Sequence, residues 1–161
     1  MSLRFLPALL LLLAAACAAQ ARTLHGVVSH VTDGDSVWVR PAEGGEAVQL
    51  RLQGLDAPEI CQAFGKQARD ALAAHVLRKR VRVVVRAQDV YRRSVGRLEL
   101  EGNDVGAWLV THGHAWSAHY QRRAGPYAAE EQQARVARRG LWEAAAPEEP
   151  KAFRKRHGSC R

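Results

Sequence analysis

Long hydrophobic runs are almost absent from this sequence of 161 residues. The one marked run, Leu9–Ala16, is too short for a membrane-spanning helix, which needs about 20 apolar residues. No later segment is long or apolar enough, so the sequence predicts no spanning helix in the body of the chain. For the N-terminal run itself, an uncleaved membrane anchor is the alternative.

Cysteine is also scarce, with three residues, and acids are the minority charge. Seven histidines are present, including His112 and His114, but they have no cysteine or acidic partner at zinc-ligand spacing. This argues against a zinc site. The 24 Lys and Arg residues outweigh the 16 Asp and Glu residues, for a formal charge of +8. Such a chain is drawn to polyanions, most simply nucleic acid, with anionic lipid or polysaccharide as alternatives.

The first residues have the pattern of an export signal. Arg4 provides a positive start, an apolar run follows, and Ala19-Gln20-Ala21 offers a small-x-small cleavage site. Residues 1–21 are therefore predicted to be a signal peptide. The alternative is a lipoprotein signal ending before Cys17, because Leu13–Cys17 loosely resembles a lipoprotein box. Both interpretations predict a periplasmic or secreted protein, and lipidation at Cys17 would anchor it in the cell envelope.

Two cysteines, Cys61 and Cys160, remain after cleavage at either position. An even number of cysteines in an exported chain is typical of a disulfide. This pair would tie the loop after a cluster of acids to the C-terminal residues. Closing a loop of roughly 100 residues contributes up to ~4.7 kcal/mol in the chain-entropy model. The alternative is two free thiols, because sequence alone does not place the two Cα atoms together.

Apolar periodicity predicts five strands and three helices. The expected strands are residues 26–31, 36–40, 48–53, 81–87 and 97–100. The expected helices are residues 62–77, 105–112 and 127–139. This order is that of a five-stranded OB-like Greek-key barrel with about three packed helices, an α+β fold that is mainly β. We see no internal repeat, and we expect one domain at residues 22–146 and a loose polar tail at 147–161 pinned by Cys160.

Acidic side chains gather between residues 33 and 59. Asp35 ends a turn that begins at Asp33, and Asp56 precedes an Ala-Pro turn that leads to Glu59. Oxygen ligands suit calcium or magnesium, and a further carboxylate can accept a proton from water. Structural roles are the alternatives. Asp35 could be only a turn former, and Asp56 a turn or helix-entry residue, while for Asp33 turn formation is the preferred role. Glu59 could be an acid in the first turn of a helix.

Two arginines are predicted to contact phosphate. Alternation in the third strand places Leu50 and Leu52 inward and Arg51 on the solvent-accessible face. Arg97 lies in the last expected strand. A guanidinium fork can bind phosphate oxygens bidentately, although either arginine could instead be a solvated strand residue. The acids and arginines together predict a nuclease.

The chain resembles the staphylococcal-type thermonucleases, the micrococcal nuclease-like family. The matching segments, in the family's order, are Asp33–Val37, Arg51–Glu59, Gly96-Arg97 and Ala137–Trp142. The resemblance implies an OB barrel with three helices. It also implies calcium-dependent endonucleolytic hydrolysis of DNA and RNA, single-stranded or locally unpaired, that leaves 3′-phosphate ends.

Roles for individual residues follow from the same resemblance. The ligands of one calcium ion would be Asp35, Asp56 and the backbone carbonyl of Ala57. The catalytic residues would be the phosphate clamps Arg51 and Arg97 and the general base Glu59. The segment 92–95 departs from the family pattern, and only His119 and Tyr120 lie near the position of its base-stacking tyrosines.

These observations predict an exported, metal-dependent endonuclease that is a monomer and needs no protein partner. The main alternative is a non-catalytic nucleic-acid-binding domain on the same fold. A third is a surface-anchored lipoprotein that binds polyanions. The presence of metal-type carboxylates, a base and two arginines in one chain argues against a purely binding role, because a binding domain needs no such set.

Overall fold

A computed structural model describes residues 22–121 and 123–160 and contains a closed barrel of five strands. The barrel strands are β1 (Arg22–Asp33), β2 (Ser36–Pro41), β3 (Val48–Leu52), β5 (Arg80–Gln88) and β6 (Ser94–Leu100). They pair in the order β3-β2-β1-β5-β6, and parallel pairing of β3 with β6 closes the ring. The short β7 (Asn103–Asp104) extends from β6, while β4 (Leu55–Asp56) pairs with β8 (Trp116–Ser117). The predicted OB-like fold is confirmed.

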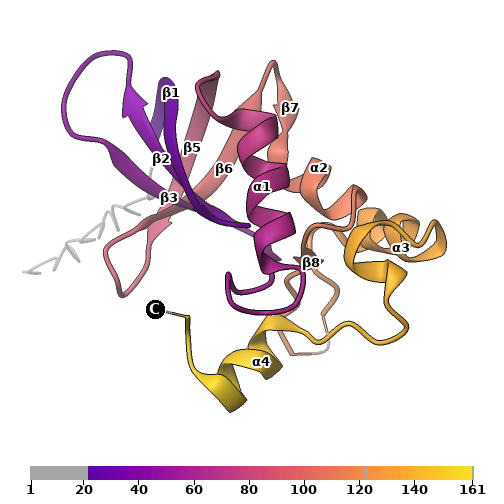
Figure 1. The fold of residues 1–161 in the computed structure, drawn as a ribbon. Coiled ribbons are helices and arrows are strands. Elements are labelled where there is room, and N and C mark those ends of the chain that lie inside the picture. Colours follow the sequence, from indigo (N-terminus) through magenta and orange to yellow (C-terminus); the bar gives the residue numbers. More distant parts are fainter. Residues whose placement is uncertain (1–21, 122, 161) are drawn as a thin grey trace, which may run out of the picture.

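Among the described residues, four α-helices accompany the barrel, one more than expected (Figure 1). They are α1 (Gly65–Val76), α2 (Val105–Thr111), α3 (Ala128–Val136) and α4 (Pro150–His157), and a 3-10 turn spans Gly140–Glu143. The first three match the predicted helices. The expectation of a loose tail is corrected, because α4 forms within it. Pro150 is a favourable residue at the start of α4. The helix is rich in basic residues, however, so the sequence shows no apolar periodicity that would have predicted it.

The hydrophobic core fills the barrel and extends under the helices. Leu50 and Leu52 of β3 are buried in it, together with Leu72 of α1 and Leu109 of α2. A second cluster joins Trp116, Ala134, Leu141 and Trp142. Within the ranges 22–121 and 123–160, no helix has the length and apolar character needed to cross a membrane. The predicted signal peptide, including Cys17, lies outside the described residues.

The turn between β1 and β2 is packed tightly against other elements. A Cβ atom at Gly34 would lie 2.7 Å from Cβ of Ala57 and 3.0 Å from Cβ of Ala68, so the turn needs glycine. The carboxylate of Asp33 accepts the backbone N–H of Asp35 at 3.0 Å, which is the turn-forming role expected for Asp33. The turn therefore holds Asp35 at a defined position next to β3.

Candidate active site

Asp35 is a buried carboxylate, only 3% exposed. Its Oδ1 accepts hydrogen bonds from Ser36 Oγ (2.8 Å) and Arg51 Nη1 (2.9 Å), and its Oδ2 accepts the Ala57 N–H at 3.3 Å. Burial raises the pKa of Asp35 well above its usual range, and the nearby Arg51 opposes this effect. Added positive charge would therefore stabilise the ionised form of Asp35.

Arg51 bridges the two carboxylates that were predicted as metal ligands. Its Nη1 donates to Asp35, and its Nη2 donates to Asp56 Oδ1 at 3.0 Å. Burial works against the charged form of Arg51, but the Asp35 and Asp56 carboxylates outweigh it and raise the pKa of Arg51. Since Ser36 of β2 pairs with Arg51 of β3, the barrel register itself brings these groups together.

Arg154 of α4 is a site residue that sequence reasoning missed. Its Nη1 and Nη2 donate to Asp56 Oδ1 (3.0 Å) and Oδ2 (2.8 Å), and Nη1 also donates to Glu59 Oε1 at 2.9 Å. The hydrogen bond to Asp56 contributes most to the raised pKa of Arg154. The predicted disulfide at Cys160 was the one sequence signal that could have placed Arg154 beside these acids.

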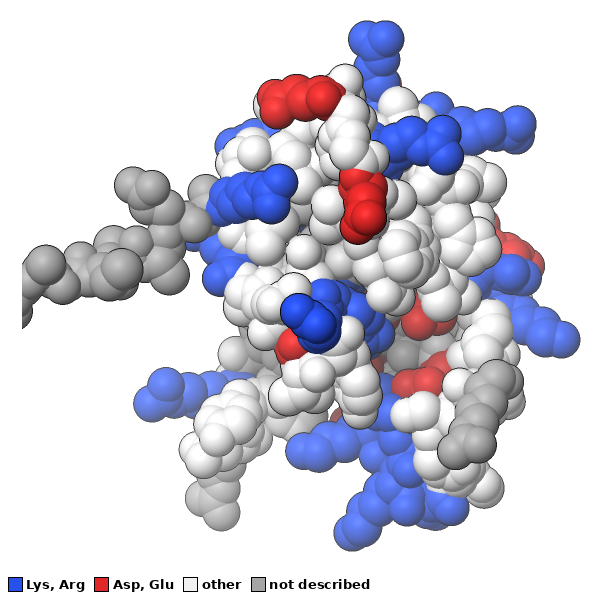
Figure 2. Space-filling view, turned by 90° about the vertical axis from the view of Figure 1, so that its left-hand side faces the viewer, with Lys and Arg blue, Asp and Glu red and all other residues white. Residues whose placement is uncertain are grey.

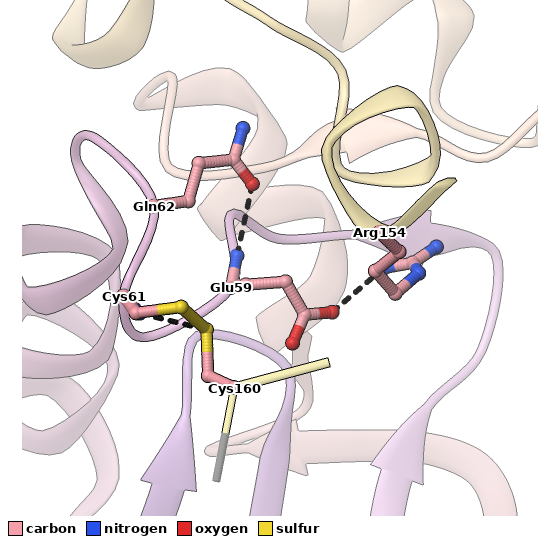
Figure 3. The surroundings of a disulfide bond; sticks show 5 residues. All are labelled: Glu59, Cys61, Gln62, Arg154 and Cys160. Carbon is pink, nitrogen blue, oxygen red and sulfur yellow. Dashed lines mark hydrogen bonds and ion pairs between the residues drawn. A yellow bond between two sulfur atoms is a disulfide. The ribbon is translucent and has the colours of Figure 1, made fainter. Parts of the chain in front are cut away.

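The disulfide joins Cys61 to Cys160, as predicted, with their Cα atoms 5.8 Å apart. Figure 3 shows it beside Glu59, with Arg154 reaching towards the Glu59 carboxylate from α4. The Glu59 backbone N–H donates to Gln62 Oε1 at 3.1 Å, which fixes the backbone turn. Glu59 lies in no helix, because α1 begins only at Gly65, so the helix-acid alternative for Glu59 is excluded.

Arg97 lies apart from this ion-pair network. Its nearest acidic partner is Asp104, with Nε 3.7 Å from Oδ2, and its side chain is 46% exposed. Arg51 pairs with Val95, two residues before Arg97 on β6, so Arg51 and Arg97 point to the same outer face of neighbouring strands. The structure thus joins Asp35, Arg51 and Asp56 directly and leaves Arg97 at the edge of the same face.

An open cleft of about 630 Å³ lies over the network. It is lined by Asp33, Gln49, Arg51, Glu59, Tyr91, Arg93, Arg154, Ser159 and Cys160. The atypical segment 92–95 begins within a loop that Asp89 holds together. Asp89 accepts the backbone N–H groups of Tyr91 and Arg93 and pairs with Arg93 Nε at 2.8 Å. That loop therefore contributes an exposed tyrosine and an arginine to the cleft.

Basic side chains predominate on one face of the molecule, which suits an anionic substrate (Figure 2). Figure 2 shows one face on which Lys and Arg side chains are widespread and Asp and Glu side chains are few. His119 lines a second cleft together with Asp56, and Tyr120 is 75% exposed. Both residues follow β8, which pairs with β4 through Trp116 and Asp56, so this segment lies near the site.

The donor set fits a hard cation. It consists of two carboxylates, Asp35 and Asp56, and the adjacent backbone carbonyl of Ala57, all oxygen atoms of the kind that calcium prefers. In the part of the chain that the structure describes, no group of three or more His, Cys, Asp or Glu side chains is arranged to hold a metal. An ion here would therefore need water or substrate oxygens as further ligands.

Comparison with known proteins identifies a family for this chain. The staphylococcal nuclease homologue family matches residues 49–144. A protein of Escherichia coli called ParB is 36% identical over 149 residues, covering 86% of this chain and 83% of ParB. An uncharacterized endonuclease of Escherichia coli O157:H7 is 33% identical over 134 residues, covering 83% of this chain and 86% of that protein.

Plant relatives are longer. The probable staphylococcal-like nuclease CAN1 of Oryza sativa subsp. japonica is 33% identical over 141 residues, which cover 84% of this chain and 43% of CAN1. The chain thus spans less than half the length of that relative. The family match covers more than half of the chain and includes Arg51, Asp56, Glu59 and Arg97. With the closed barrel and the acid–arginine network, these matches show that the chain belongs to the staphylococcal nuclease family.

Proposed function

We propose that this protein is an exported endonuclease that hydrolyses phosphodiester bonds of DNA and RNA with the help of one calcium ion. The observation that carries the proposal is the bridge from Arg51 to both Asp35 and Asp56, with Glu59 alongside. A guanidinium between two carboxylates is pre-organised before substrate arrives, and a third carboxylate next to it can accept a proton. A purely binding surface needs no such arrangement.

The calcium ion would be held by Asp35, Asp56 and the carbonyl of Ala57. When bound, it supplies Lewis acidity and neutralises charge on the phosphate. Asp35 is well suited to this role because it is buried and positioned by three hydrogen bonds. Its neighbour Ser36 keeps Oδ1 oriented, so that little reorganisation is required.

The chain's own groups carry the rest of the reaction. Glu59 accepts a proton from the attacking water, whose oxygen forms a bond to phosphorus while the bond to the 5′ oxygen breaks. A 3′-phosphate remains, and the leaving 5′ oxygen takes up a proton from solvent to become a hydroxyl. Arg51 spreads positive charge over the phosphoryl oxygens as the negative charge increases. Arg97, on the same outer face, provides a second guanidinium along the strand.

The setting of the site supports an unpaired, anionic substrate and an exported protein. The cleft is open and carries exposed Tyr91, an aromatic ring on which a splayed base can stack. A disulfide between Cys61 and Cys160 persists best in an oxidising compartment such as the periplasm. We further propose that the protein acts as a monomer without an obligate protein partner.

The decisive experiment is a cleavage assay on protein purified from the periplasm. Single-stranded DNA and RNA are incubated with added calcium or with excess chelator, and the product ends are determined. We expect cleavage with calcium, 3′-phosphate ends, and loss of activity in chelator. Cleavage undiminished by chelator would refute the metal assignment. Binding of DNA without cleavage under any condition would support the non-catalytic binding alternative.

A further inference from the structure

Arg154 and Arg51 together occupy most of the acceptor capacity of Asp56. Each carboxylate oxygen can accept about two hydrogen bonds. Oδ1 of Asp56 already accepts from both Arg51 and Arg154, and Oδ2 accepts from Arg154. A cation that binds Asp56 must therefore share it with a guanidinium that already neutralises its charge. Two positive groups at such short range repel each other.

Glu59 is engaged by the same guanidinium. Nη1 of Arg154 lies 2.9 Å from Glu59 Oε1, and the Arg154 side chain is only 30% exposed. This hydrogen bond occupies one of the two Glu59 oxygens that could accept a proton from water. Arg154 thus opposes both of the proposed steps at this site, metal binding and proton transfer.

Covalent and polar contacts hold α4 in place beside the acids. The Cys61–Cys160 disulfide attaches the end of the chain beside Glu59, six residues beyond Arg154. At the start of α4, Gln62 Nε2 donates to the Glu148 carbonyl at 2.6 Å, and Arg156 pairs with the Glu148 carboxylate. A tether of this kind raises the effective concentration of the arginine at the acids.

We propose that α4 is an autoinhibitory arm, in which Arg154 competes with the divalent cation for Asp56 and engages Glu59, and that the disulfide strengthens this competition. The inference rests on the proposed function, because it assigns regulation to the same site. It predicts that metal affinity is set by the position of the C-terminal helix. Reducing the disulfide would then increase metal affinity.

The test is calcium titration by calorimetry in the absence of nucleic acid. We expect Arg154→Gln to bind calcium roughly 5–150-fold more tightly than the parent, the usual range for coupled equilibria. Lys155→Gln is the matched control, because it removes one exposed base from the same helix. Lys155 takes part in none of the ion pairs formed by residues 22–121 and 123–160, and its variant should bind calcium like the parent. Thermal unfolding of each variant establishes that it is folded.

A second comparison isolates the tether. Reduction of the parent protein, or the paired change Cys61→Ser with Cys160→Ser, should tighten calcium binding. The same treatment of Arg154→Gln should change the affinity little, because the competing guanidinium is already gone. Equal tightening in both backgrounds would show that the disulfide acts by another route and would overturn the tether part of the proposal.

The remaining outcomes separate this inference from the proposed function. Unchanged or weaker calcium binding by Arg154→Gln, or no calcium binding by either protein, would overturn the autoinhibition. Tighter calcium binding without cleavage of any nucleic acid would support the competition and refute the nuclease. If Arg154→Gln binds calcium no better and loses turnover at saturating calcium, Arg154 is a positioning residue for Asp56 and Glu59, and the arm is not inhibitory.

Discussion

The carboxylate of Asp35 lies buried 2.9 Å from Nη1 of Arg51, across the β2–β3 pair. Neither group would be stable there alone, because burial disfavours the charged form of each. Their pairing leaves the second guanidinium nitrogen of Arg51 free to reach Asp56. One arginine therefore organises two acids that are separated along the chain.

Replacing Arg51 with lysine should separate catalysis from binding. Lysine keeps the charge but loses the planar fork, so it cannot bridge Asp35 and Asp56 in the same way. We expect turnover to fall by roughly 10²–10³-fold, as for other lost transition-state donors, with a much smaller loss of substrate affinity. Single-turnover kinetics and salt-titrated DNA binding measure the two quantities.

Arg97→Lys provides the comparison for that experiment. Arg97 lies at the edge of the site, 3.7 Å from Asp104, so its change leaves the Asp35–Asp56 bridge intact. If both arginines stabilise the transition state, both variants lose turnover more than affinity. Equal losses of rate and affinity would mean that the arginines only hold the strand, and the clamp role would be withdrawn.

Glu59→Gln should lower turnover by roughly 10²–10⁴-fold with little loss of DNA binding. Glutamine has nearly the same shape and can still contact Arg154, but it cannot accept the proton from water. The measurement is the rate of cleavage at saturating calcium and substrate. Activity within about twofold of the parent would exclude Glu59 as the base.

Reduction of the disulfide should destabilise the protein without removing the barrel. The Cys61–Cys160 bridge closes a loop with a sequence separation of 99 residues, for which the chain-entropy model allows up to ~4.7 kcal/mol. We expect a lower midpoint of thermal unfolding for reduced protein and for the paired Cys→Ser variant. Non-reducing peptide mapping of periplasmic protein checks the pairing, and two free thiols there would contradict it.

His114 should make stability depend on pH. Burial, and secondarily His112, lowers the pKa of His114 to about 4, below its ordinary value of 6.5. Between these values the unfolded chain binds the proton more readily, so this contribution to stability is present above about pH 6.5 and is lost as pH falls towards 4.

The matched variant for that prediction is His114→Gln. The unfolding midpoint of the parent should drop more steeply than that of His114→Gln between pH 6.5 and pH 4. The difference between the two curves is the relevant quantity, because other groups, Asp35 among them, titrate in both proteins. Parallel curves would show that His114 does not contribute.

The barrel could be predicted from sequence because period-two alternation reports burial directly. In β3, Leu50 and Leu52 are fully or nearly fully buried while Arg51 points outward, as the alternation predicted. Local turn residues likewise predicted the turn at Asp33 and the position of the acids around the Ala-Pro turn. Matching family segments placed Asp35, Asp56 and Glu59 in one site, and the structure joins the last two through Arg154.

Only the tertiary structure decided what α4 does. Arg154 meets Asp56 across a separation of 98 residues, and no local periodicity encodes such a contact. The helix is short and mostly basic, so it buries little, and its place depends on ion pairs and on the disulfide rather than on an apolar face. Hydrophobic patterning therefore determined the barrel and the phase of its strands. The pairing of the buried charges depends on tertiary contacts between segments that are distant in the sequence, so local patterns could not predict it.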